Sequence, residues 1–554
     1  MNPNPVRRLM LRASLLALGC GLGLLVACGS SDDAPATPGP VTPPPPATAQ
    51  FTLTLASQKL LIEQGTSVTV DATVTRAAGF NAAVNVTVSG LPAGVTAAPV
   101  TIASAATTAP ITLVAQANAA HSLPTASMAT GTAGAETAQQ GFTVTVRGPA
   151  GSLDTSFAGG IVDTPIGTGE DYAKAMAVQA DGRIVVAGST TTPQGTDIAL
   201  VRYQRDGAID MSFGTGGKVV TPVGSGSEEA YAVALQADGK IVVAGGSSQG
   251  ASGIDFVLLR YNADGSLDAG FGTDGKVTTS FGNQTDRAYA VIIQSDNKIV
   301  VGGETTQGAS GVDFALARYL SNGSLDASFG TGGRVITSLR SDASGEHVYA
   351  LALQTIANVE HIVAVGGEGD FMAARYTPAG MLDPSFGTGG RIVGLFNATI
   401  GAAHGVLVTP DNKLVIAGQT GNHHSLVRLS ENGVLDTTFG VGGRVVTPVN
   451  PANWDGARGV VRQADGKLVT GGWANTGLSG SADFVVLRYS ADGVLDAGFG
   501  NGGTVITPVA PGTKTDTAFA VALQADDRVP TTRIVLAGSA NDANNNFAVT
   551  RYWP

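Results

Sequence analysis

Short apolar runs bounded by Gly, Asn and Asp recur along residues 151–554. In one stretch these runs are 217–223, 230–236, 240–246 and 255–262. Runs of this length that are rich in Val, Ile, Tyr and Phe predict β-strands. The same group of four runs occurs seven times, so the sequence predicts a repeat protein with four strands in each unit.

An arginine ends the last run of each group, an aspartate follows eight residues later, and a phenylalanine comes three residues after the aspartate. The complete pairs are Arg202/Asp210, Arg260/Asp268, Arg318/Asp326, Arg375/Asp383, Arg428/Asp436 and Arg488/Asp496. Asp154 opens the series without an arginine before it, and Arg551 ends it without an aspartate after it. Because these two fragments complete one another, we expect a closed propeller, with Asp154 beside Arg551, rather than an open solenoid.

The eight-residue step has a geometric cause, because a tight turn separates each arginine from its aspartate. Pro378 fixes φ near −65° at the first turn position, and a glycine occupies the third position in every copy. This pattern predicts a type I turn followed by a left-handed glycine. In such a hairpin Tyr261 faces Leu267 and Arg260 faces Asp268, so each copy should hold a cross-strand ion pair.

The pattern RYNADGSLDxxFGxxGKV, followed by QADGKIVVAGG, resembles the bacterial delta-60 repeat family. The resemblance extends over essentially all of residues 151–554, although Leu429 replaces the usual tyrosine and the second turn is longer at 355–360 and 525–532. It implies a β-propeller of the kind found in secreted and surface proteins, and it implies no activity. The expected fold class is all-β, with a seven-bladed β-propeller of four-stranded repeats after an immunoglobulin-like β-sandwich.

That sandwich is expected at residues 51–147. The segment alternates apolar and small polar residues with a period of two, which is typical of half-buried strands. About seven short strands in about 100 residues suit an immunoglobulin-like module. Cys20 and Cys28 are the only cysteines of the chain, so this module would lack a disulfide.

Residues 1–28 read as a targeting segment. Three arginines precede an apolar run that ends in Leu25-Val26-Ala27-Cys28, which resembles a bacterial lipoprotein signal with lipid attachment at Cys28. An ordinary secretory signal is the alternative. Gly29 follows the cysteine, and by resemblance to enterobacterial lipoproteins this favours the outer membrane. The Pro-rich residues 29–50 would act as an extended linker between the lipid and the folded part.

Composition argues against several function classes. The formal net charge of −11, without basic clusters, makes nucleic acid an unsuitable partner. The sequence has no H-E-x-x-H motif, Walker loop or dinucleotide fingerprint. Gly-rich runs such as GGSSQGASG (245–253), which contains the string G-S-S-Q-G, are expected in strand connections, where glycine serves turns. We therefore predict no catalytic residue, metal or cofactor.

The string Asn262, Asp264, Asp268 resembles a calcium loop, but its oxygens are lost in other copies, so turns are the preferred interpretation.

The connections at one face are long and vary between copies, and a propeller carries its specificity on such loops. His423, His424, Trp454, Asp455 and Trp473 occur there in the fifth and sixth units and are the candidate contacts for a glycan or protein ligand. Ordinary loop residues, with Trp473 filling a gap between blades, are the alternative.

Two functions stay open: a monomeric, lipid-anchored, non-enzymatic binding protein of the cell envelope, or a hydrolase or lyase acting on polysaccharide. Paired carboxylates at the channel mouth would favour the enzyme.

Overall fold

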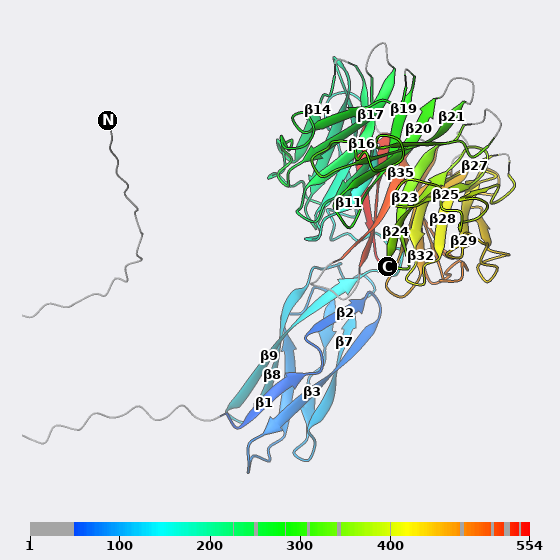
Figure 1. Ribbon diagram of the computed structural model, residues 1–554. Coiled ribbons are helices and arrows are strands. Elements are labelled where there is room, and N and C mark those ends of the chain that lie inside the picture. Colours follow the sequence, from blue (N-terminus) through cyan, green and yellow to red (C-terminus); the bar gives the residue numbers. More distant parts are fainter. Residues whose placement is uncertain are drawn as a thin grey trace, which may run out of the picture. The chain divides into compact units, whose positions relative to one another are not determined.

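The computed structural model describes residues 49–224, 226–248, 253–282, 284–306, 311–340, 345–398, 400–476, 481–510, 515–525, 532–541 and 544–554. Residues Ala49–Pro554 hold two parts, one built from strands β1–β9 and one from strands β10–β37 (Figure 1). The expected signal peptide, with Cys28, and almost all of the expected linker lie outside the described residues. Within these ranges no helix has the length and apolar character needed to cross a bilayer.

The first part is a pair of β-sheets. One sheet has the order β1 (Phe51–Leu55), β3 (Ser67–Arg76), β7 (Thr108–Ala115), β5 (Val95–Ala97). The other has the order β2 (Lys59–Glu63), β9 (Glu136–Arg147), β8 (Thr125–Ala133), β4 (Val84–Ser89), β6 (Val100–Ile102). Alternate residues such as Val70, Ile111 and Val144 enter one shared core, as the period-two pattern predicts. Nine strands are present where about seven are expected, and two of them, β5 and β6, are only three residues long.

Seven four-stranded sheets follow, and they are the blades of a β-propeller. Blades one to three are β11 (Asp171–Val178), β12 (Ile184–Thr192), β13 (Gly195–Tyr203), β14 (Lys218–Thr221); β15 (Glu228–Leu235), β16 (Ile241–Ser248), β17 (Ile254–Tyr261), β18 (Lys276–Thr279); and β19 (Asp286–Ile293), β20 (Ile299–Thr306), β21 (Val312–Tyr319), β22 (Arg334–Thr337). Blades four to six are β23 (Val348–Ile356), β24 (Val359–Gly366), β25 (Met372–Tyr376), β26 (Arg391–Val393); β27 (Gly401–Val408), β28 (Leu414–Thr420), β29 (His423–Leu429), β30 (Arg444–Thr447); and β31 (Asp455–Arg462), β32 (Leu468–Asn475), β33 (Ala482–Tyr489), β34 (Thr504–Thr507).

The grouping of the runs into blades differs from their order in the repeat. The run 217–223 precedes the second unit in sequence, but its strand β14 is the outer strand of the first blade, paired with β13. Each loop after a fourth strand is therefore a connection between blades rather than a hairpin. The first strands of all seven blades contact one another in a closed cycle, so they surround the propeller axis.

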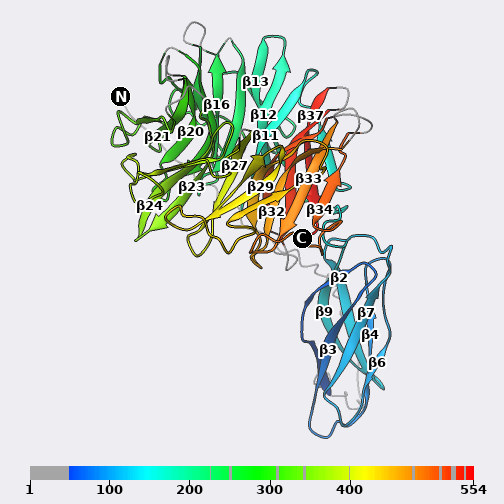
Figure 2. The ribbon, with the colours of Figure 1, turned by 90° about the vertical axis from the view of Figure 1, so that its right-hand side faces the viewer.

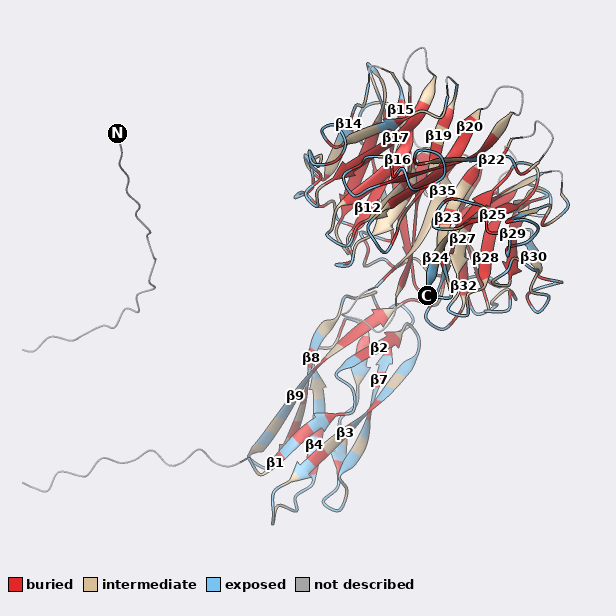
Figure 3. Ribbon diagram, in the orientation of Figure 1, coloured by how far each residue is buried: buried red, intermediate tan, exposed pale blue. Residues whose placement is uncertain are grey.

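The core lies between blades. The second and third strands read as nearly continuous apolar runs because both of their faces are covered, as β16 and β17 illustrate. Val242 of blade two packs with Val301 of blade three, and Val535 of blade seven packs in the same way with Val186 of blade one. Figure 3 shows this burial along the middle of the blades. The interface between the last and first blades is thus equivalent to the others.

Blade seven is made from both ends of the propeller segment. Its order is β10 (Ile161–Thr164), β37 (Asn545–Tyr552), β36 (Arg533–Asn541), β35 (Thr517–Gln524), and in Figure 2 its red strands adjoin the cyan first blade. Arg551 Nη2 lies 2.8 Å from Asp154 Oδ2, so the expected closing pair is present. The tight turn of this blade is split in two, with Gly151 N donating to Trp553 O at 2.9 Å and Trp553 N donating to Ser152 O at 3.0 Å.

Candidate functional site

The repeated Arg–Asp pairs form one structural motif. In all seven copies a guanidinium nitrogen lies 2.7 to 2.9 Å from an aspartate oxygen. The guanidinium carbon also lies 4.4 to 4.8 Å from the centre of the motif phenylalanine. Arg318 reaches the next blade, where it donates to Pro378 O at 2.5 Å, and Arg375 does the same to Glu431 O at 2.5 Å. The motif therefore joins neighbouring blades.

Each of these aspartates has a second basic neighbour that the repeat analysis did not identify. A residue at the N-terminal end of the second strand places a nitrogen 3.0 to 3.8 Å from the same aspartate; these residues are Arg183, Lys240, Lys298, His361, Lys413, Lys467 and Arg533. Burial acts to raise the pKa of Asp326, but hydrogen bonds from Ser328 and the charges of Arg318 and Lys298 outweigh it and lower the pKa to about 2. Seven equivalent carboxylates, each bound to basic side chains, have a structural role.

The predicted turns are present. Gly265 has a φ of 88°, and Asn262 N donates to Ser266 O. Tyr261 and Leu267 form an antiparallel β-bridge, so the hairpin has the geometry of a type I turn followed by a left-handed glycine. Asp264 Oδ1 accepts hydrogen bonds from the backbone and hydroxyl of Ser266. Its carboxylate thus stabilises the turn, and in the described ranges no group of three or more His, Cys, Asp or Glu residues could hold a metal ion.

The predicted ligand contacts of blades five and six fall into two groups. Asp455 is 0 % exposed, and its carboxylate accepts from His424 N at 2.6 Å, Val449 N at 3.1 Å and the ring of His423. His424 is also buried, and desolvation lowers its pKa to about 4. Neither side chain is open to a ligand, which corrects the expectation that His424 and Asp455 contact one. Trp454 is 55 % exposed, and His423 and Trp473 are partly buried.

The burial of Asp455 follows from its place in the repeat. In five other blades an acidic residue lies at, or one or two residues before, the start of the first strand and accepts a backbone N–H from the preceding connection; these residues are Asp171, Glu228, Asp286, Glu346 and Asp516. In the connection that leads into blade five, Asp370 of blade four takes this role and accepts from Phe396 N at 3.0 Å. The acidic residue closes the connection between blades.

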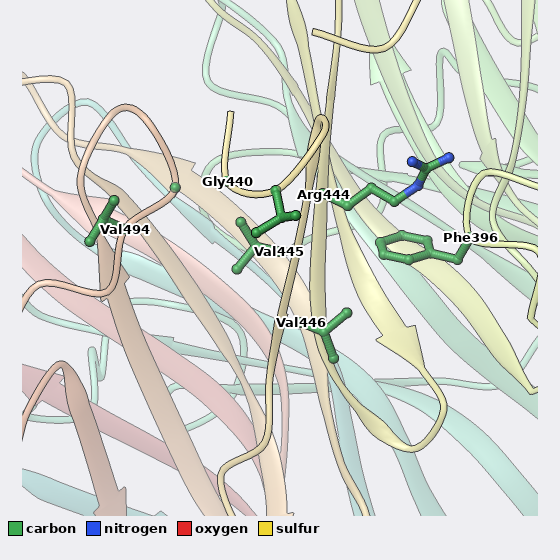
Figure 4. Close-up of a pocket in the computed structure, with 8 residues that line it drawn as sticks. Phe396, Gly440, Arg444, Val445, Val446 and Val494 are labelled. Carbon is green, nitrogen blue, oxygen red and sulfur yellow. The ribbon is translucent and has the colours of Figure 1, made fainter. Parts of the chain in front are cut away.

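Crevices between neighbouring blades recur at the outer strands. One of about 500 Å³ is lined by Phe396, Arg444, Val446 and Val494 (Figure 4). Corresponding crevices of about 780 and 600 Å³ lie beside Arg334 and Lys276, which hold the same repeat position as Arg444. A crevice that recurs at equivalent places is a consequence of the repeat, and it offers little to distinguish one ligand from another.

The first strands, which surround the propeller axis, differ from the outer strands because they carry side chains that vary between blades. Every first strand contains a β-bulge, and the extra residue is a different side chain in most blades. The seven bulged residues, here called the bulge ring, are Lys174, Tyr231, Tyr289, Tyr349, His404, Arg458 and Phe519. A bulge re-aims a side chain out of the regular pleat, and such bulges are common beside functional sites.

Contacts link the bulge ring from blade to blade. Tyr289 lies between Tyr231 and Tyr349, with ring centres 5.0 and 5.3 Å away, and Tyr349 lies 4.7 Å from His404. Phe519 lies between two cations, with Arg458 Cζ 5.9 Å and Lys174 Nζ 4.0 Å from its ring centre. All seven side chains are half-buried. Blades of one fold thus present an asymmetric set of aromatic and charged groups around the axis.

Glu304 and Glu229, two carboxylates beside the ring, are engaged. Glu304 accepts from Arg287 at 3.0 Å and contacts the ring of His347. Burial favours neutral Glu304, but His347 and Arg287 outweigh it and lower the pKa of the Glu304 carboxyl. Burial acts to lower the pKa of His347, yet Glu304 raises it overall. Glu229 accepts from the hydroxyl of Tyr231.

A cavity of about 370 Å³ opens beside the ring at blades four to six. Tyr349, His404, Arg458, Gln419 and Glu368 are among the residues that line it. Sequence reasoning missed this site because the period-two pattern assigns the bulged residue to an ordinary strand. A signal exists all the same, since in every copy a large variable residue stands between two small ones, as in Ala403-His404-Gly405, or between valine and alanine at Tyr349.

Comparisons with known proteins support the fold and leave the site open. The comparison with curated proteins gives no match. A solved structure of a DUF4784 family protein from Bacteroides caccae covers 69 % of this chain and 93 % of its own, at 6 % identity and a TM-score of 0.22. Domains 4–9 of surface layer protein SbsC cover 91 % of this chain and 82 % of their own, at 11 % identity and a TM-score of 0.14. Neither likeness is close enough to carry an argument.

A family model described as "Domain of unknown function (DUF5122) beta-propeller" matches residues 179–213, 236–271, 294–329, 409–439 and 463–499. These segments span the tight turns and Arg–Asp pairs of blades one, two, three, five and six. The chain therefore carries DUF5122 beta-propeller repeats, which are of the delta-60 type, across residues 179–499.

Proposed function

We propose that this protein is a non-enzymatic recognition protein whose ligand binds at the bulge ring. The observation that supports this is the asymmetry of the ring, because the same position is tyrosine, histidine, arginine, lysine or phenylalanine in different blades. The turns at the opposite end repeat one set of groups. A rigid scaffold with a varied set of aromatic and polar groups at one end suits binding of a glycan or a peptide.

The engaged carboxylates favour binding over a polysaccharide hydrolase. A glycosidase needs two carboxyl groups free to act on the scissile bond. Glu304 is held by Arg287 and His347, and Glu229 by Tyr231. The two-sheet module would be an immunoglobulin-like spacer, and the propeller would act as a monomer.

A glycan and peptide binding array with the purified protein tests the proposal. For a ligand found in this way, Tyr289→Ala should weaken binding at the ring, and Trp454→Ala should weaken it by ~1–3 kcal/mol if the ligand also reaches the loops of blade six. Asp264→Ala, in a tight turn at the other end, is the matched control and should leave affinity unchanged. Loss of binding in Asp264→Ala, with Tyr289→Ala silent, would place the site on the opposite face.

We further propose that Cys28 carries a lipid that anchors the protein in the outer membrane. The support is the order of basic residues, apolar run and cysteine in residues 7–28. In a bacterial host, Cys28→Ser should move the protein from the membrane fraction to the soluble fraction, as measured by immunoblotting of both. Cys20→Ser is the control and should stay with the membrane. Unchanged membrane association of Cys28→Ser would refute the anchor.

A further inference from the structure

Two cations of the bulge ring differ from the other basic groups near the channel. Arg458 Nη1 donates to His404 Nε2 at 2.6 Å, and Arg458 Nε is buried without a hydrogen-bond partner in the described part of the chain. Lys174 Nζ rests on the ring face of Phe519. Among the described residues no carboxylate forms an ion pair with either cation. By contrast, Arg287 and His347 share Glu304.

His404 is neutral, so it does not compensate the charge of Arg458. A guanidinium has no lone pair to offer, so the Nε2 atom of His404 must accept the hydrogen bond and the ring is the neutral Nδ1–H tautomer. Burial and the charge of Arg458 both hold the pKa of His404 well below its ordinary value. Desolvation also lowers the pKa of the Arg458 guanidinium and of the Lys174 amine. Charges in these surroundings gain more from a counter-ion than solvated charges do.

Arg458 opens into the cavity that Tyr349, His404 and Gln419 also line. The one carboxylate in that lining is Glu368, whose oxygen lies 3.6 Å from His347 Nε2. The cavity, at about 370 Å³, falls in the size range of small-molecule sites. Its walls combine an arginine suited to two-point carboxylate binding, aromatic rings and a side-chain amide that can bind hydroxyl groups.

We propose that this cavity binds the carboxylate of an acidic sugar residue through Arg458, with Lys174 supplying a second, more distant positive charge. This rests on the proposed function and specifies its ligand class. A uronic acid has the required features, because its carboxylate would meet Arg458, its ring hydroxyls would meet Gln419, and its apolar ring face would pack against Tyr349. An acidic peptide shares the carboxylate but lacks the hydroxylated ring.

Isothermal titration of the purified protein with tri-galacturonate, galactotriose and tri-glutamate tests this assignment. Tri-galacturonate should bind most tightly, and added NaCl should weaken it because the interaction is ionic. Arg458→Met should weaken tri-galacturonate at least ten-fold, and Lys174→Met by a smaller factor. Arg462→Met is the matched control, because it removes the same charge from an exposed position of the same strand, and it should bind like the unaltered protein.

The outcomes separate this inference from the proposed function. Equal tri-galacturonate affinity in Arg458→Met and the unaltered protein would overturn the anion site, while binding itself would remain. Tighter binding of tri-glutamate would overturn the sugar class, and tighter binding of galactotriose would overturn the need for a carboxylate. Thermal melting without ligand controls for folding: Arg458→Met should melt at or above the temperature of the unaltered protein, because an unpaired, desolvated charge is removed. If it melts lower, Arg458 has a structural role and the assignment fails.

Discussion

Replacing Arg375 with alanine should lower the free energy of unfolding by about 3–5 kcal/mol, the cost of leaving a buried charge without its partner. Arg375 is 0 % exposed and binds Asp383 at 2.8 Å, Gln354 at 2.9 Å and Ser385 at 2.8 Å. It also donates to Glu431 O in the next blade, so its loss leaves unsatisfied acceptors in two blades.

Chemical denaturation of the purified protein measures this effect. Arg391→Ala is the control, because the Arg391 side chain is exposed and, among the described residues, donates only to Ser338 O at 3.0 Å, so its loss should cost less than about 1 kcal/mol. The paired Asp383 has a lowered pKa: burial opposes this, and Ser385 and Arg375 outweigh burial. A lowered folded-state pKa means that the pair contributes stability above the ordinary pKa of aspartate and loses it as pH falls below that value. Equal costs for the two variants would show that burial of the pair adds nothing.

Deleting residues 545–554 should abolish the cooperative fold of the propeller. The deletion removes β37, which pairs with β36 and β10, together with Arg551 and Trp553. It also exposes the apolar residues that Phe547 and Val549 cover between blades seven and one. We expect a loss of at least about 5 kcal/mol, comparable to the whole stability of many domains.

Near-UV circular dichroism and denaturant titration would record this loss. Deleting Pro554 alone is the control and should leave both signals intact, because the hydrogen bonds of Trp553 and the Arg551–Asp154 pair remain. A deleted protein with an unchanged unfolding midpoint would mean that six blades close without the seventh.

Local geometry explains which features the sequence predicts. The eight-residue step from Arg260 to Asp268 predicts a tight turn, and the turn places the two side chains opposite each other. The ion pair can therefore be predicted from one copy of the repeat. Lys240 joins the same aspartate from the neighbouring second strand, at 3.8 Å, and no spacing rule for one hairpin includes it. The closing pair was predictable because the repeat supplied the missing halves.

The site was harder to predict because it depends on departures from the repeat. Asp455 follows the exposed Trp454, and the loop position predicts a ligand contact, yet Asp455 shares a register with Asp171 and Asp286, which are buried acceptors in their own blades. The alternation of apolar and polar residues predicts Arg458 as a regular strand residue, because this pattern contains no signal for a β-bulge. The role proposed for Arg458 depends on its neighbours Tyr349, His404 and Gln419, which other blades bring to the same cavity.

The split turn of blade seven sets the order in which the propeller can be completed. β10 pairs with β37, nearly the whole length of the propeller later in the chain. A chain that emerges from the ribosome or a translocon with its N-terminus first must therefore hold 161–164 unpaired until 547–550 arrive. Contacts this distant in sequence make folding slow and leave a strand edge exposed in the meantime. Blades one to six can form as they emerge, but the ring itself is a post-translational event.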